Sequence, residues 1–265
     1  MTDIAGIKGD LYQASVIARY ELIKHIRSKK MYIFLILLGI IFALILSVFL
    51  LLDFQNKVTI LALACVSTSS IVILVAAILF AATALVSEFE ERTALLMFTR
   101  PVRKITILAG KFIASALITS LMIVIYFVVF GIISIGLYGE FLGNLLVAIG
   151  VAIAIGLCYI GMAFLISSFA KKGSTASILT LVMNLIIISM ISMILGFAAP
   201  DLDLWFMPDV AASALYVALD IGVVIIGGSV QVFSTVDIVT SVGVLLAWCI
   251  GTLAVSYAIF RRREF

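Results

Sequence analysis

Six stretches of the chain are continuously apolar and carry no Asp, Glu, Lys, Arg or His. Each is longer than the roughly 20 residues that a helix needs to cross about 30 Å of hydrocarbon. The stretches lack the alternation of apolar and polar positions that is typical of a barrel strand, so they predict helices. The predicted membrane spans are residues 31–52, 58–87, 112–139, 141–170, 173–200 and 238–260.

The composition supports this pattern and excludes several classes of protein. Of 265 residues, 65% are hydrophobic and 12% are charged. A soluble domain is about half apolar and a quarter charged, so a soluble enzyme, a disordered protein and a disulfide scaffold are excluded. Cys65, Cys158 and Cys249 lie far apart in apolar stretches and are expected to be small core residues. The sequence predicts an all-α integral membrane protein with one transmembrane domain, residues 1–265.

The distribution of charge predicts the orientation of the chain. If the N-terminus is cytoplasmic, Lys57 is the only one of the 17 basic residues that falls on the outer side. Inner loops are enriched in Lys and Arg, and the opposite orientation would reverse this distribution. Both termini of this multi-pass protein are therefore expected on the cytoplasmic side of the cell membrane.

Residues 10–30, before the first span, have the pattern of an amphipathic helix. Apolar positions such as Leu11, Val16 and Leu22 share one face, which Arg19 interrupts. A basic amphipathic helix of this kind lies along a membrane surface. It could anchor the chain to anionic lipid or contact a partner, and the pattern does not decide between them. His25 has no second metal ligand nearby and is expected to be exposed at the interface.

The segment 88–104 joins the second and third spans and is longer than a chain reversal requires. It begins with acidic, helix-forming residues, continues with apolar residues and is interrupted by Pro101. Acidic residues early in a helix suit its dipole, so we expect a helix that protrudes from the inner face. A solvated connecting loop is the alternative.

The segment 201–237 is expected on the outer side, after Pro200 ends the fifth span. It reads as short interfacial or re-entrant helices between spans five and six, since Gly227-Gly228 and the β-branched residues around them do not favour a stable lone helix. A seventh span through 221–233 is the alternative, but it would break the charge distribution at Arg261–Arg263.

The absence of ionisable residues from the six spans bears on function. Such residues mark proton relays and ion sites in membrane proteins. The chain also has no HExxH, GxSxG or P-loop pattern, and we predict no catalytic, cofactor-binding or metal-binding residue in it. If the protein moves a solute, the energy must come from a partner on the inner face. A stand-alone ion-coupled carrier or channel, and a non-transporting membrane anchor, are the alternatives.

A few polar residues lie within the spans. Ser67 and Ser70 belong to the second span, and the fifth span contains Thr180 and Asn184. Small and polar residues allow close packing and hydrogen bonding between helices in lipid. The same four residues could instead line a path for cargo.

The order of residues from Glu88 to Lys111 resembles the signature of type-2 ATP-binding-cassette (ABC) transporter permeases. That signature has an acidic residue, Gly-Thr, leucines, a Pro, basic residues and a Gly-Lys pair that opens the next span. The matching residues here are Thr93, Leu95, Leu96, Pro101, Arg103, Gly110 and Lys111. Arg92 replaces the usual Gly. The segment Arg19–Leu22 with Arg27 resembles the family's amphipathic helix, and Tyr257–Glu264 resembles its aromatic and basic C-terminus.

The resemblance implies a membrane subunit, most often of an exporter, that pairs with a second permease copy or paralogue and with two cytoplasmic ABC ATPases, which bind ATP and Mg. In such families the loop after the second span is the coupling helix. The residues that the resemblance places against the ATPase are Glu88, Glu90, Glu91, Arg92, Thr93 and Pro101. It gives Glu21, Lys24 and Arg27 a supporting role, and it places the second and fifth spans along the path, with no nucleic-acid partner.

Overall fold

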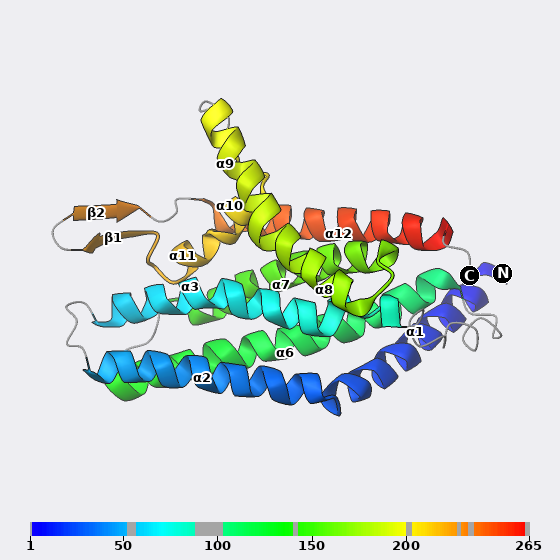
Figure 1. The fold of residues 1–265 in the computed structure, drawn as a ribbon, viewed down its shortest axis with the longest axis horizontal. Coiled ribbons are helices and arrows are strands. Elements are labelled where there is room, and N and C mark those ends of the chain that lie inside the picture. Colours follow the sequence, from blue (N-terminus) through cyan, green and yellow to red (C-terminus); the bar gives the residue numbers. More distant parts are fainter. Residues whose placement is uncertain are drawn as a thin grey trace.

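The structure, a computed structural model, describes residues 2–51, 57–87, 103–139, 143–199, 203–226, 229–232 and 236–262. Most of these residues form an elongated helical bundle (Figure 1). The helices are α1 (Thr2–Ile26), α2 (Lys29–Leu51), α3 (Lys57–Ala77), α6 (Lys104–Tyr138), α7 (Leu145–Phe169), α8 (Gly173–Val182), α9 (Ile188–Ala198), α10 (Pro208–Ala212), α11 (Ala214–Ala218) and α12 (Ile238–Arg262). Two π-helical turns, Ile78–Ala82 and Met183–Ile187, extend α3 and join α8 to α9.

Six helices of the described part are long and apolar enough to cross a membrane, which confirms the predicted fold class. They are α2, α3 with its π turn, α6, α7, the continuous helix α8–α9, and α12. Figure 1 shows α8–α9 crossing the other spans obliquely, with α9 standing away from the bundle. The predicted burial of Cys65, Cys158 and Cys249 is also confirmed.

Helix α7 occupies the centre of the bundle and packs against α12, α6 and α3. Glycine allows the closest of these approaches. A Cβ atom at Gly161 would lie 2.5 Å from Oγ1 of Thr252 and 3.1 Å from the carbonyl oxygen of Cys249, both on α12. Small residues of this kind allow helix backbones to approach in lipid, where the hydrophobic effect does not drive helices together.

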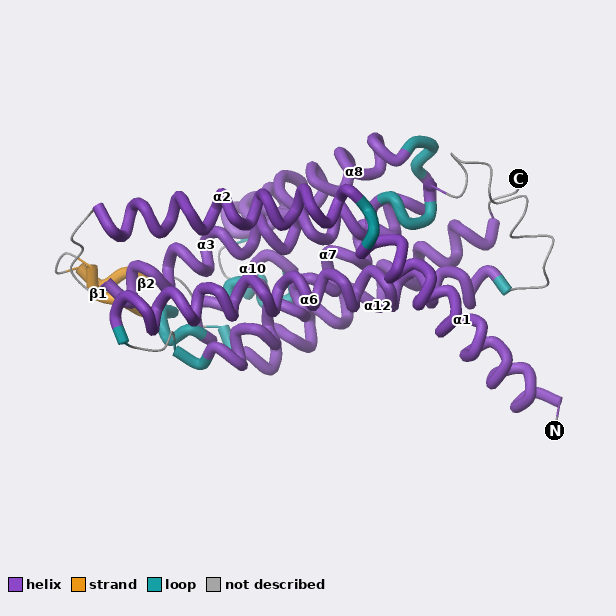
Figure 2. The backbone as a smooth tube through the Cα atoms, turned by 90° about the horizontal axis from the view of Figure 1, so that it is seen from below, coloured by secondary structure: helices purple, strands orange, loops and turns teal. Residues whose placement is uncertain are grey.

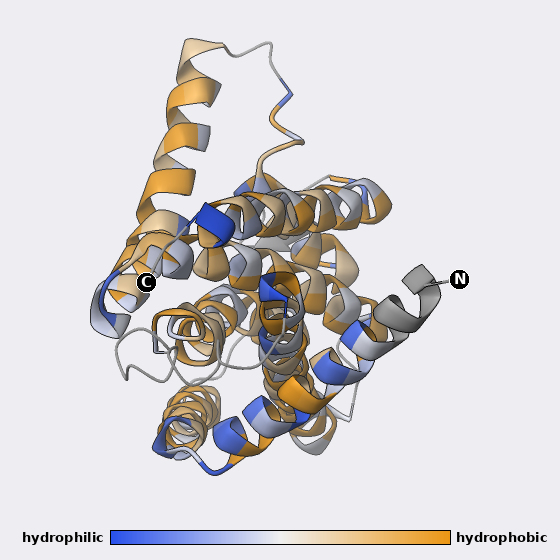
Figure 3. Cartoon of the chain, turned by 90° about the vertical axis from the view of Figure 1, so that its right-hand side faces the viewer, coloured by the Kyte–Doolittle hydropathy of each residue, from blue (hydrophilic) through white to orange (hydrophobic). Residues whose placement is uncertain are grey.

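Helix α1 leaves the bundle obliquely at the end where α12 finishes (Figure 2). It carries hydrophilic positions on part of its surface, whereas the spans are mostly hydrophobic (Figure 3). The helix begins at Thr2, earlier than the segment 10–30 predicted from the pattern. Similarly, α6 begins at Lys104, eight residues before the apolar run that starts at Phe112.

The segment 201–237 differs in part from the prediction. Its described residues include the short helices α10 and α11, as expected, but residues 223–226 and 229–232 are strands and not helices. Strands β1 (Val223–Ile226) and β2 (Ser229–Val232) pair antiparallel, with Val223 opposite Val232 and Ile226 opposite Ser229. Helices were therefore the wrong prediction here, because a run of β-branched residues favours a strand. The strands also exclude a seventh spanning helix through 221–233.

Candidate coupling site and bundle cavity

The end of α3 has an irregular backbone immediately before residue 88. The α-helix changes to a π turn at Ile78–Ala82, and a further turn leads to Ser87. A π turn shifts the backbone hydrogen-bond register by one residue and is common at functional sites. Backbone groups freed in this way need other partners inside a membrane protein.

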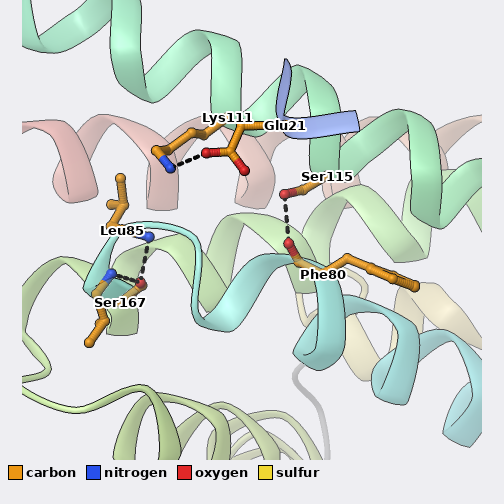
Figure 4. Close-up of polar contacts among 7 residues, drawn as sticks. Glu21, Phe80, Leu85, Lys111, Ser115 and Ser167 are labelled. Atoms are coloured by element: carbon orange, nitrogen blue, oxygen red, sulfur yellow. Dashed lines mark hydrogen bonds and ion pairs between the residues drawn. The ribbon is translucent and has the colours of Figure 1, made fainter. Parts of the chain in front are cut away.

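Side chains from three other helices bond to this end of α3. Oγ of Ser115 on α6 donates a hydrogen bond of 2.8 Å to the carbonyl oxygen of Phe80. Oγ of Ser167 on α7 accepts hydrogen bonds of 3.2 Å from the amides of Leu85 and Val86 (Figure 4). Nζ of Lys30 on α2 donates to Oγ1 of Thr83 at 2.8 Å and to the carbonyl oxygen of Leu79 at 3.3 Å. We call residues 78–87 with these three side chains the α3 clasp.

An ion pair joins α1 to α6 beside the clasp. Nζ of Lys111 lies 2.5 Å from Oε1 of Glu21, and the Lys111 side chain is 1% exposed (Figure 4). Burial opposes the charged form of Glu21, but the Lys111 ammonium outweighs it and holds the pKa of that carboxyl below its usual range. Gly110 permits the close approach of α1, because a Cβ atom there would lie 2.8 Å from Cγ2 of Ile17.

His25 is buried, so the expectation of an exposed residue at the interface was wrong. Its ring and the Phe80 ring pack edge to face at a centroid distance of 5.5 Å, which places α1 against the clasp. The pKa of His25 is lowered to about 4, chiefly by burial; Glu21 opposes this shift, and the nearby ammonium groups of Lys30 and Lys111 add to it. The ring is therefore neutral at physiological pH.

We expect the packing of α1 to weaken as the pH falls from about 6.5 to 4. In that range the unfolded chain binds a proton at His25 that the folded protein does not, so stability is complete above pH 6.5 and is lost below it. The loss should be about 2 kcal/mol, since the ring is not wholly desolvated. Thermal unfolding of wild type and His25→Leu across this range tests the prediction, and parallel pH profiles would contradict it.

The structure places only some of the residues assigned to ATPase contact. Six of them lie in 88–102, outside the described residues: Glu88, Glu90, Glu91, Arg92, Thr93 and Pro101. Lys24 on α1 and Arg27 directly after α1 are exposed, whereas Glu21 points inward to Lys111. This ion pair could not be predicted from the sequence, because Lys111 was expected to precede the third span.

Of the four polar residues proposed for a path, two meet at one cavity. Ser70 of α3 and Asn184, in the π turn between α8 and α9, line a cavity of about 210 Å³. Ser67 is exposed and donates to the carbonyl oxygen of Leu63, and Thr180 is buried and donates to that of Ala176. These last two residues do not line the cavity.

The cavity also contains polar residues that sequence reasoning did not assign to a site. Tyr159 of α7, Ser189 of α9 and Asp209 of α10 line it. Oδ1 of Asp209 accepts a hydrogen bond of 2.6 Å from Ser192. The serines are recognisable as polar residues of the fifth span. Nothing in the sequence predicts that Asp209, in the segment 201–237, lies beside residues of the spans.

Comparison with known protein families identifies the family of this chain. A family model described as ABC-2 family transporter protein matches residues 15–265. The chain belongs to the ABC-2 transporter family. A comparison with curated proteins found no significant match. As an ABC-2 family member with six apolar helices, the chain is a multi-pass membrane protein with the general role of a permease.

The described residues of this ABC-2 protein hold no cluster of three or more His, Cys, Asp or Glu that could bind a metal ion. In this family the nucleotide is bound by a partner ATPase. Two features of the described residues are candidates for a part in transport: the α3 clasp and the cavity at Asn184 and Asp209.

Proposed function

We propose that this chain is the membrane permease of an ABC exporter, driven by separate cytoplasmic ATPase subunits that bind ATP and Mg. The termini and segment 88–102 would face the cytoplasm, as the excess of basic residues at that end favours. A second permease copy or paralogue would complete the path. The family membership supports the permease role, and the α3 clasp supports the coupling.

The main support for the proposal is that segment 88–102 follows the clasp directly in the chain. When the ATPase moves segment 88–102, Leu85 and Val86 move with it, since they lie only a few residues earlier in the chain. Their hydrogen bonds to Ser167 transmit the movement to α7 at the centre of the bundle. Phe80 and Ser115 provide a second connection, to α6. A flexible exit from α3 would absorb the motion, whereas this one is fixed by hydrogen bonds to three helices.

Charge reversal within segment 88–102 tests the coupling. Glu91→Arg or Arg92→Glu should lower the ATPase activity of the assembled complex by roughly tenfold or more, since like charges at an interface cost several kcal/mol. Hydrolysis of MgATP by the reconstituted complex is the measurement. Insertion of the variants into the membrane should be unchanged.

Lys171→Glu is the matched control, because Lys171 is exposed in the short turn between α7 and α8 and lies outside segment 88–102. It reverses a charge at the same end of the bundle and should leave the hydrolysis rate unaltered. Unchanged activity in both segment variants would refute this placement of the ATPase contact.

A further inference from the structure

We infer that the cavity between α3, α7, α9 and α10 binds the protonated amine of a small amphipathic molecule. This inference deepens the proposed function, since it names a class of cargo for the permease. It rests on the depth of the cavity, one carboxylate, one buried acceptor and the apolar walls.

The cavity lies near the middle of the spans. Ser70 is halfway along the span Val58–Ala82, and Tyr159 is close to the midpoint of Leu145–Phe169. Polar groups at this depth are costly unless they are paired or hydrated. Polar side chains gathered here therefore favour a polar occupant.

Asp209 gives the cavity a negative charge. It is the charged residue among the described residues that line the cavity, and no described Lys or Arg lines it. Ser192 donates to Oδ1, but a carboxylate can accept about four hydrogen bonds, so most of its capacity remains. A carboxylate in apolar surroundings is stabilised by a cation, and an organic ammonium supplies both charge and donors.

Asn184 adds a buried acceptor. Its Nδ2 donates 2.9 Å to the carbonyl oxygen of Thr180, which fixes the other amide atom as oxygen. That oxygen, Oδ1, is buried and has no hydrogen-bond partner among the described residues. Oδ1 itself has no surface open to the cavity, so a ligand donor reaches it only after a small turn of the Asn184 side chain. Because a buried acceptor without a partner is costly, that turn is favoured when the ligand donates a hydrogen bond.

The remaining walls and the volume limit the molecule that fits. Ile71, Leu74 and Leu185 provide apolar contacts. A volume of about 210 Å³ is below the range of about 300–1,000 Å³ typical of drug-sized ligands. The site therefore suits a small aryl- or alkylammonium ion with its ammonium group toward Asp209 and Asn184.

A purely structural role for Asp209 makes a different prediction. Asp209 lies in the first turn of α10, where a negative charge stabilises a helix, and it bonds Ser192. If those were its only roles, the cavity would not distinguish an amine from an alcohol of the same shape. Ligand selectivity, rather than stability, therefore separates the two explanations.

The test titrates 2-phenylethylamine, protonated at pH 7, and neutral 2-phenylethanol into nanodiscs that contain the full chain in zwitterionic lipid. Isothermal calorimetry, corrected with empty nanodiscs, gives each Kd. The amine should bind at least tenfold more tightly than the alcohol. Asp209→Asn should remove this preference, and Asp203→Asn, an exposed carboxylate of the same segment, should keep it.

Two further variants test the inference even if the Asp209→Asn variant does not fold. Asn184→Leu should weaken both probes, because both donate a hydrogen bond to Oδ1. Ala212→Leu should fill the cavity and abolish both heats while Asp209 stays in place. Equal affinity for the two probes in wild type, no binding of the amine, or an amine preference that survives Asp209→Asn would overturn the inference. None of these outcomes involves the ATPase, so they are distinguishable from failure of the coupling variants.

Discussion

Glu21→Gln is expected to destabilise the packing of α1 on α6 by about 3 kcal/mol. The substitution removes a carboxylate 2.5 Å from the Lys111 ammonium, whose side chain is almost completely buried. Taking away one partner of a buried ion pair is strongly destabilising, because the remaining charge stays in surroundings that solvate it poorly. Thermal unfolding of the purified protein at neutral pH measures the loss.

A second ion pair, between α1 and the residue that precedes α6, provides the control. Asp10 and Arg103 lie 3.0 Å apart, but their side chains are 28% and 70% exposed. Exposed pairs contribute little, so Asp10→Asn should change stability by no more than about 0.5 kcal/mol. The double variant Glu21→Gln/Lys111→Met should recover most of the loss. Equal effects of Glu21→Gln and Asp10→Asn would show that burial of the first pair does not matter.

Gly161→Leu is expected to prevent α7 and α12 from packing, with a loss of about 3 kcal/mol or more. Even a Cβ atom at this position would lie within 3.2 Å of the Cys249 backbone, which cannot move aside as a flexible side chain can. Because this is the most extensive helix contact in the described bundle, we expect little monodisperse protein on size-exclusion chromatography.

Gly150→Leu, on the same helix, is the matched control. Nothing lies within 4 Å of a Cβ atom at Gly150, and the residue is exposed on the surface of the bundle. The same change of residue there should leave the yield and the unfolding temperature unaltered. Similar behaviour of the two variants would mean that the approach of α7 to α12 at Gly161 is not required for folding.

The spans were predictable because membrane insertion depends on local composition. Each apolar run contains enough residues to form a helix across the bilayer, whatever its neighbours are. The polar residues of the fifth span were likewise visible, and Asn184 does line a cavity with Ser70. These features need only the sequence of one segment.

Features that depend on two distant segments were not predictable. Lys111 precedes the apolar run, yet α6 begins at Lys104 and α1 covers the lysine. Burial of His25 requires Phe80, and the position of Asp209 depends on how the chain returns after α9. The spacing of hydrophobic residues within one segment gives no information about contacts with a distant segment. Strands β1 and β2 were missed because the β-branched residues of this segment were read only as unfavourable to a helix and not as favouring strands.

The most direct test of the account is accumulation of labelled amphipathic solutes by proteoliposomes that contain the chain, with and without a candidate ABC ATPase encoded beside it. Each preparation is given MgATP or an imposed proton or sodium gradient. We expect that accumulation requires both the ATPase and ATP, and that the chain alone accumulates nothing on either gradient. Uphill accumulation by the chain alone, driven by an ion gradient, would contradict it.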